Sequence, residues 1–272
     1  MNYTKTRQAD SRKKLSGNTI KTIAFVTMSI GIAATAILDR ILLNNGLAEV
    51  SNDSAAYETF MASNGTLFIT DYILQLIGML AFPLFCFLLV EGFLHTSSLK
   101  TYAAGLSIVA LVSEVPFDLV YSGTFFNPYR QNPVFCLLLG LGTLAVLEKA
   151  EVSLKQSAPW KQTTLKLLIA IAACVLAVLF RIDYGIFGPL IIIILYVLRA
   201  RNVFGMALAC FLLATTSQTL GFLCFLDILP VLFYNGERGF GRKYVFYAVY
   251  PLVLLIVYAA VLIMGLGGVQ IL

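Results

Sequence analysis

Apolar residues occur in long runs along this 272-residue chain, and short polar segments separate the runs. Several runs are long enough to cross about 30 Å of hydrocarbon, because an α-helix rises about 1.5 Å per residue. We therefore expect an all-α, polytopic integral membrane protein with about nine transmembrane helices. The expected spans are 19–43, 68–96, 101–122, 133–147, 164–180, 184–198, 204–219, 220–234 and 244–265. The segment 220–234 is short, and it is either an eighth span or a broken one.

Composition supports the membrane class and excludes a soluble domain. Hydrophobic residues make up 59% of the chain and charged residues 12%, whereas a soluble domain carries about 25% charged residues. The net charge is +5, but the cations lie in short loops between apolar runs. We therefore interpret them as topology signals rather than as a nucleic-acid-binding surface.

The distribution of lysine and arginine predicts a cytoplasmic N-terminus. With that orientation, three of the 19 cations fall outside, namely Arg40, Arg130 and Arg181, and the other 16 fall inside. The same asymmetry favours an odd number of spans. Residues 1–18 are polar and basic, and we expect them to form a disordered cytoplasmic tail. Residues 19–267 then form the transmembrane domain.

Glu91 and His95 are the most informative ionisable residues, and they lie at the cytoplasmic end of the second span. Their i, i+4 spacing places both side chains on one helix face. His95 is the only histidine in the chain. One interpretation is that the carboxylate orients the imidazole, which acts as a general base. The alternative is a helix-end cation at the membrane interface beside a carboxylate.

Two further polar groups are candidates for binding. The motif YNGERG supplies Asn235, Glu237 and Arg238 at the cytoplasmic side, although a plain interfacial turn would also use Asn-Gly. Glu114 and Asp118 are spaced i, i+4 in the outer half of the third span. Charges at membrane depth need partners.

The outer arginines are the candidates for that role. We predict that Arg130 or Arg181 pairs with the acids of the third span, and Arg40 is a further candidate. The outer layer is then either a structural ion-pair layer or a functional one.

The five cysteines lie in apolar runs without paired spacing, so we expect free thiols and no metal site.

Four stretches, taken in order, resemble a known family. They are NTIKTIAFVTM at 18–28, AFPLFCFLLVEGFLHT at 81–96, SEVPFDLV at 113–120 and LFYNGERG at 232–239. Their order and spacing, from about Asn18 to about Val261, resemble the TraX family of membrane proteins. The best-known member of that family is an acetyltransferase that caps the N-terminus of conjugative pilin. The resemblance implies acetyl transfer from acetyl-coenzyme A (acetyl-CoA) to a peptide N-terminus, or to a glycan or lipid acceptor at the membrane.

The resemblance also implies roles for individual residues. The expected catalytic residues are His95 and Glu91. The expected substrate-binding residues are Glu114, Asp118, Asn235, Glu237 and Arg238. Arg238, Arg242 and Lys243 are expected to meet the phosphates of coenzyme A (CoA).

One departure from the family pattern bears on catalysis. The family carries an Asp-His pair shortly after the first Thr-Met, and Gly31 and Ile32 occupy those positions here. A catalytically inactive relative that binds or scaffolds a membrane partner is therefore an alternative function. A transporter that uses Glu114 and Asp118 is another, although we find no internal repeat and no matched broken helices.

Overall fold

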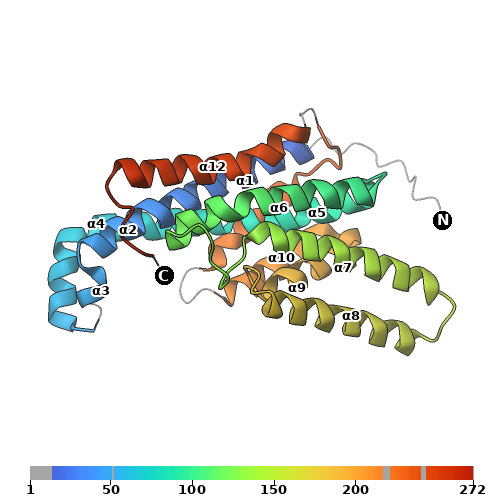
Figure 1. Cartoon of the computed structure of the whole chain (residues 1–272). Coiled ribbons are helices and arrows are strands. Elements are labelled where there is room, and N and C mark those ends of the chain that lie inside the picture. The colour runs from blue at the N-terminus through green and yellow to red at the C-terminus, as the bar shows by residue number, and fades with distance from the viewer. Residues whose placement is uncertain (1–13, 51, 217–220, 240–242, 272) are drawn as a thin grey trace.

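The computed structural model describes residues 14–50, 52–216, 221–239 and 243–271, and these residues form helices joined by short loops (Figure 1). The first elements are α1 (Gly17–Ala33), η1 (Ala34–Leu38), α2 (Asp39–Asn44), α3 (Leu47–Val50), α4 (Ser54–Met79), α5 (Ala81–His95) and α6 (Leu99–Ser122). They are followed by α7 (Pro133–Ser153), α8 (Pro159–Leu179), α9 (Phe187–Val197), η2 (Arg199–Arg201), α10 (Asn202–Ala214), η3 (Gly221–Asp227), α11 (Ile228–Leu232) and α12 (Lys243–Ile263).

The all-α, multi-span prediction is confirmed, but the described residues hold fewer candidate spans than the nine expected. Within the described residues, six helices are long and apolar enough to cross a membrane. They are Gly17–Asn44, Ser54–His95, Leu99–Ser122, Pro133–Ser153, Pro159–Leu179 and Phe246–Ile263. α9 and α10 form a pair bent by 74°, which can count as a seventh span. With 11 and 13 residues, neither helix is long enough to cross alone, and Gly221–Leu232 is also too short.

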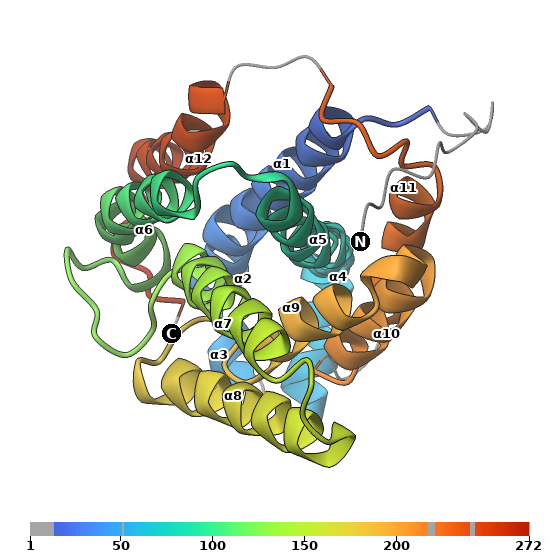
Figure 2. The same ribbon diagram turned by 90° about the vertical axis from the view of Figure 1, so that its right-hand side faces the viewer.

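α5 lies near the centre of the bundle, with α1, α7, α9 and α10 around it (Figure 2). It is apolar around almost its whole circumference, which is the pattern of a helix buried on all sides. Leu84 and Cys86 are fully buried, and Leu89 and Val90 are nearly so. Glu91 and His95 come at its C-terminal end, so this rigid central helix positions them.

Glycines bring α1 and α4 unusually close together. A Cβ added to Gly31 would lie 2.6 Å from the Cα atom of Gly78, and the reverse substitution gives the same distance. Small residues allow this backbone approach in membrane helices. Ile32, the next residue, is 6% exposed and belongs to the core. The positions where the resemblance implies an Asp-His pair therefore serve helix packing in this chain.

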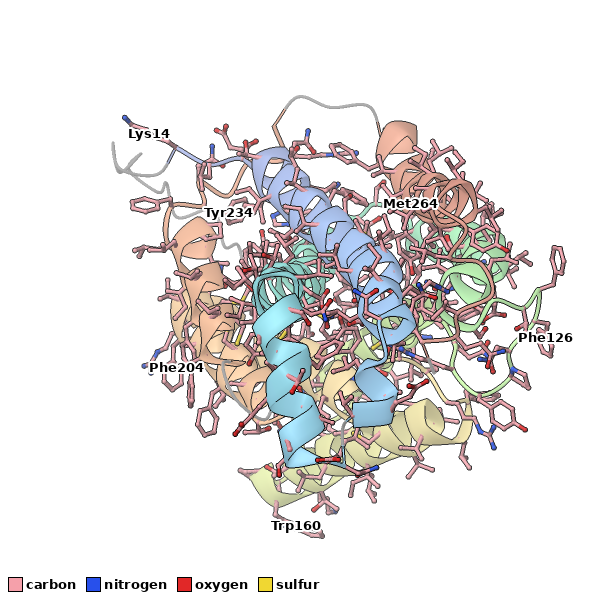
Figure 3. All side chains as sticks on the ribbon, turned by 90° about the vertical axis from the view of Figure 1, so that its left-hand side faces the viewer. Lys14, Phe126, Trp160, Phe204, Tyr234 and Met264 are labelled. Carbon is pink, nitrogen blue, oxygen red and sulfur yellow. The ribbon has the colours of Figure 1, made fainter. Side chains whose placement is uncertain are left out.

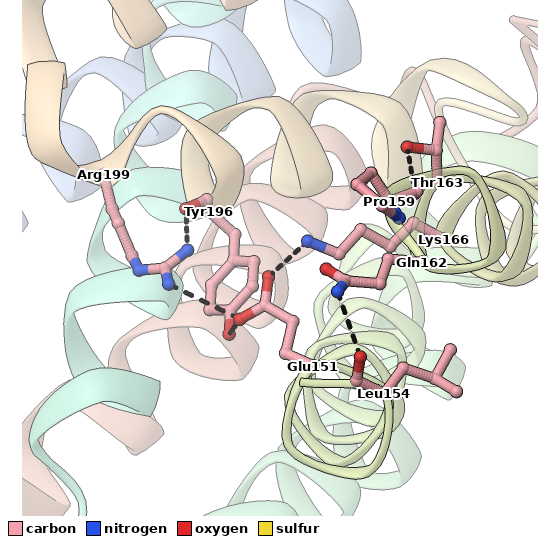
Figure 4. Close-up of polar contacts among 8 residues, drawn as sticks. All are labelled: Glu151, Leu154, Pro159, Gln162, Thr163, Lys166, Tyr196 and Arg199. Carbon is pink, nitrogen blue, oxygen red and sulfur yellow. Dashed lines mark hydrogen bonds and ion pairs between the residues drawn. The ribbon is translucent and has the colours of Figure 1, made fainter. Parts of the chain in front are cut away.

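Polar contacts tie the helices together at both ends of the bundle. At the end that carries His95, called the inner end from here on, Glu151 accepts from Lys166 at 2.8 Å and lies 3.6 Å from Arg199 (Figure 4). At the opposite, outer end, Gln131 forms a parallel bridge with Ile182.

The first described residues pair with the segment before α12. Leu15 forms a parallel bridge with Tyr234, and its backbone N–H donates to the Phe233 carbonyl at 3.1 Å. Figure 3 shows the neighbouring Lys14 on the same side of the molecule as Tyr234. Residues 1–13 of the expected disordered tail lie outside the described residues, and residues 14–18 lie within them.

Candidate functional site

A cavity of about 410 Å³ opens at the inner end and lies between α1, α5, α6, α7, α12 and the segment that follows α11. Its mouth is polar, and the polar residues there are Asn18, Lys21, Glu91, His95 and Arg238. Its walls are apolar and aromatic, with Phe25, Phe85, Leu106 and Tyr250 among the lining residues. Ligand sites typically combine such a lining with a few polar groups.

The cavity extends from the exposed surface into the bundle. His95 and Arg238 are exposed and mark the outside of the mouth. At its depth lie Phe82 and Tyr184, whose rings stack with centroids 3.5 Å apart and planes 9° from parallel. A ligand can therefore place a polar group at the mouth and an apolar group toward the bundle interior.

His95 is held in one orientation by the last turn of α5. Its Nδ1 atom lies 2.8 Å from the backbone carbonyl oxygen of Glu91. A carbonyl oxygen can only accept, so Nδ1 carries the proton that it donates. In the neutral ring, Nε2 is then the unprotonated nitrogen, and it can accept a proton from a substrate.

The carboxylate of Glu91 does not play the part that the sequence suggested. We expected it to orient the imidazole, but the Glu91 carbonyl does so. Carbonyls in the last turn of a helix lack backbone partners, so a side chain four residues on can satisfy them. The Glu91 carboxylate instead accepts from the Tyr234 hydroxyl at 3.0 Å. Sequence reasoning did not select Tyr234, although it is the first residue of the YNGERG motif.

The YNGERG segment builds a turn that caps α1. The side-chain oxygen of Asn235 accepts from the Glu237 backbone N–H at 2.8 Å. The Glu237 and Arg238 carbonyls accept from the Gly17 and Asn18 backbone N–H groups at 2.8 and 2.9 Å. Asn235 and Glu237 therefore shape the mouth through the backbone, and Arg238 lines the cavity.

The structure describes the side chains of only some of the cations that were expected to bind phosphate. Arg242 lies outside the described residues, and so does the side chain of Lys243. Lys21, which sequence reasoning did not select, lines the mouth together with Arg238. Its Nζ atom lies 4.7 Å from the ring centroid of Phe246.

The predicted pairing of Glu114 and Asp118 with outer arginines is wrong. Glu114 accepts from both the backbone N–H and the side-chain amide of Asn132, and Asp118 accepts from the Asn127 backbone N–H at 2.8 Å. Neutral donors from the loop after α6 thus take the place of the arginines. The two acids are also not among the residues that line the described cavity.

The outer arginines have other contacts. Arg130 pairs with Asp183 at 3.0 Å; burial alone would lower the pKa of Arg130, but the Asp183 carboxylate raises it above its ordinary value. Arg40 is 1% exposed and donates to three backbone carbonyls, those of Ala36, Val120 and Val269. Arg181 lies over the Tyr129 ring, 4.9 Å from its centroid.

A second acidic pair lies toward the outer end and was not selected from the sequence. The Gln75 side-chain amide donates to Asp39 at 3.1 Å and to Asp71 at 2.8 Å. Asp71 is 5% exposed. Because it falls early in an apolar run, nothing in the sequence shows that it meets Asp39 from another helix.

Asn132 should matter for stability more than the acids do. It is fully buried, its amide nitrogen also donates to the Ala110 carbonyl at 2.8 Å, and its oxygen caps α7 by accepting from Val134 N–H at 2.9 Å. We expect Asn132→Ala to cost about 1–3 kcal/mol of stability, seen as a lower melting temperature in detergent. Asn127→Ala is the control, because it keeps the backbone N–H that meets Asp118; an equal loss in both variants would contradict the assignment.

Comparisons with known proteins add an independent finding. The family described as TraX protein matches residues 16–261. A probable fimbrial assembly protein FimC, serogroup H1, of Dichelobacter nodosus is 29% identical over 203 residues, which cover 65% of this chain and 78% of the relative. No solved structure matches the chain.

Proposed function

The chain is a multi-pass membrane protein of the TraX family, and from this premise we propose that it is an acyltransferase that takes an acetyl group from acetyl-CoA. The observation that supports this most is the placement of His95. Its Nδ1 atom donates a hydrogen bond to the Glu91 carbonyl, and the residue lines the mouth of an apolar cavity. Nε2 is thereby available as a general base.

The proposed reaction needs one proton acceptor beside the thioester. As the acceptor's amine or hydroxyl attacks the acetyl carbonyl carbon, Nε2 of His95 takes up its proton. The carbon–sulfur bond then breaks, and the imidazolium returns the proton to the sulfur, so that CoA leaves as its thiol. The products are the acetylated acceptor and CoA, and no oxidant or metal is consumed.

The cavity suits both substrates of this reaction. Its volume of about 410 Å³ falls in the usual range for ligand sites, about 300–1,000 Å³. The polar mouth can hold the polar part of acetyl-CoA with its thioester beside His95, and the apolar walls can hold an apolar part of the acceptor. We expect the mouth to face the cytoplasm, where acetyl-CoA is found, because lysines and arginines gather at that side.

We propose a peptide N-terminus as the acceptor, with a glycan or lipid group as the alternatives. The name of the relative from Dichelobacter nodosus refers to fimbrial assembly. By extension, a subunit of a surface fibre is the first acceptor to test here.

A non-catalytic membrane scaffold is the second candidate function. The observation that favours it is the close packing of Gly31 against Gly78, which leaves no room for the acidic residue of the family pattern. In that case CoA could still bind, but nothing would be transferred.

The proposal can be tested by incubating the purified protein, in lipid nanodiscs, with acetyl-CoA that carries a label in its acetyl group. We expect label to appear on the α-amine of an acceptor peptide, and an acceptor blocked at that amine should stay unlabelled. Binding of acetyl-CoA without transfer would favour the scaffold. Absence of both binding and transfer would overturn the acyltransferase proposal.

A further inference from the structure

Two cations line the cavity mouth. Lys21 comes from α1 and Arg238 from the segment before α12, and both line the same cavity. Neither forms an ion pair with any residue that the structure describes. Lys21 is only partly exposed and lies against Phe246. Phe246 in turn stacks on Phe25, with ring centroids 5.8 Å apart.

An unsatisfied buried donor lies beside these cations. Asn18 is 8% exposed, and its Nδ2 atom has no hydrogen-bond partner among the described residues. It lines the same cavity, three residues before Lys21 on α1, so the two side chains are neighbours on one helix face. Buried amide donors without partners are uncommon in folded proteins and call for an explanation.

The acidic groups at the mouth do not satisfy this cluster. The Glu91 carboxylate accepts from Tyr234, and the nearest described contact of the Glu237 carboxylate is the Asn235 amide at 3.5 Å. The positive end of the α1 helix dipole adds to the field there. The mouth therefore presents two cations and an amide donor to whatever enters it.

We propose that Asn18, Lys21 and Arg238 form a subsite for a phosphoryl group. A tetrahedral phosphoryl group offers several acceptor oxygens to one neutral and two charged donors, and lysine and arginine are the usual residues for such recognition. Where the ligand is CoA, this inference rests on the proposed function and makes α1 a binding element for the donor. A phospholipid headgroup carries the same chemistry, and the experiment separates the two sources.

Binding measurements in nanodiscs of zwitterionic lipid test the subsite directly. The probes are CoA, 3′-dephospho-CoA and pantetheine, which lacks phosphate. We expect Lys21→Met and Arg238→Gln each to weaken CoA binding about tenfold or more, as loss of a charge-assisted hydrogen bond does. Pantetheine binding should be unchanged in both. Lys100→Met is the matched control, because Lys100 is exposed at the same end and does not line the cavity.

The outcomes separate this inference from the proposed function. If wild type binds no CoA but binds anionic phospholipid in a Lys21-dependent way, the subsite stands and the acyltransferase proposal fails. If both variants bind CoA and phospholipid as wild type does, the subsite is overturned, whatever the transfer activity. Arg238 is exposed, so Arg238→Gln gives a folded variant even if Lys21→Met lowers the yield.

Discussion

Replacing His95 by alanine should lower acetyl transfer by about 10²–10⁴-fold, the usual contribution of a general base. CoA binding should stay close to wild type, because the proposed phosphate contacts lie on other residues. Gly31 and Ile32, at the positions where the resemblance implies an Asp-His pair, are engaged in packing and supply no base. The measurement is transfer of labelled acetyl to the acceptor at matched levels of folded protein.

Glu91→Gln is the informative companion variant. It keeps the backbone carbonyl that orients His95, and the glutamine oxygen can still accept from Tyr234. We therefore expect a much smaller loss than for His95→Ala. Near wild-type transfer by His95→Ala would show that the histidine only caps the end of α5. A lower melting temperature with unchanged specific activity would point the same way.

Gly31→Ala should be among the most destabilising single-methyl additions in the chain. The new Cβ would lie 2.6 Å from the Cα of Gly78, and the neighbour is backbone, which cannot rotate away. Overpacking of this kind costs about 1–3 kcal/mol or more. Gly31→Asp, which restores the acid of the family pattern, should cost more still. The measurements are folded yield and the melting temperature in detergent.

Gly142→Ala is the control for this prediction. Gly142 also lies inside a membrane helix, α7, but a Cβ there would meet nothing within 4 Å. Alanine favours the helix over glycine by about 1 kcal/mol, so this variant should be as stable as wild type or slightly more so. A Gly31→Ala protein with unchanged stability would show that α1 and α4 separate easily, and the packing explanation would fail.

Hydropathy was sufficient to identify the main helices but not where they begin. The second span was expected from Phe68, whereas α4 starts at Ser54. Its first turns carry polar residues such as Asn64, which form helix without needing hydrocarbon around them. Hydropathy also divided 204–234 into two spans. The short helices there, α10 and α11 among them, bury some apolar residues, such as Met206 and Val231, and expose others, such as Phe211. Hydropathy does not show that each of these helices is too short to cross the membrane.

Some of the residues selected from the sequence line the cavity, and others, such as Glu114 and Asp118, do not. The spacing of Glu91 and His95 placed both on one face of a helix, and the cavity does reach both. Their hydrogen bonds depend on a free helix-end carbonyl and on Tyr234, 143 residues away in sequence. For the same reason Glu114 was assigned to an arginine, when a buried asparagine in the next loop meets it.

The backbone pairing of Leu15 with Tyr234 has a consequence for biosynthesis. Chains fold from the N-terminus as they are made. This pairing, however, joins an early segment to one that leaves the ribosome near the end of synthesis. α12, which follows it, contributes Phe246, Tyr247 and Tyr250 to the cavity wall. The early helices can therefore enter the membrane before the cavity exists. A chain whose synthesis ends after α11 would be inserted in the membrane with an incomplete cavity.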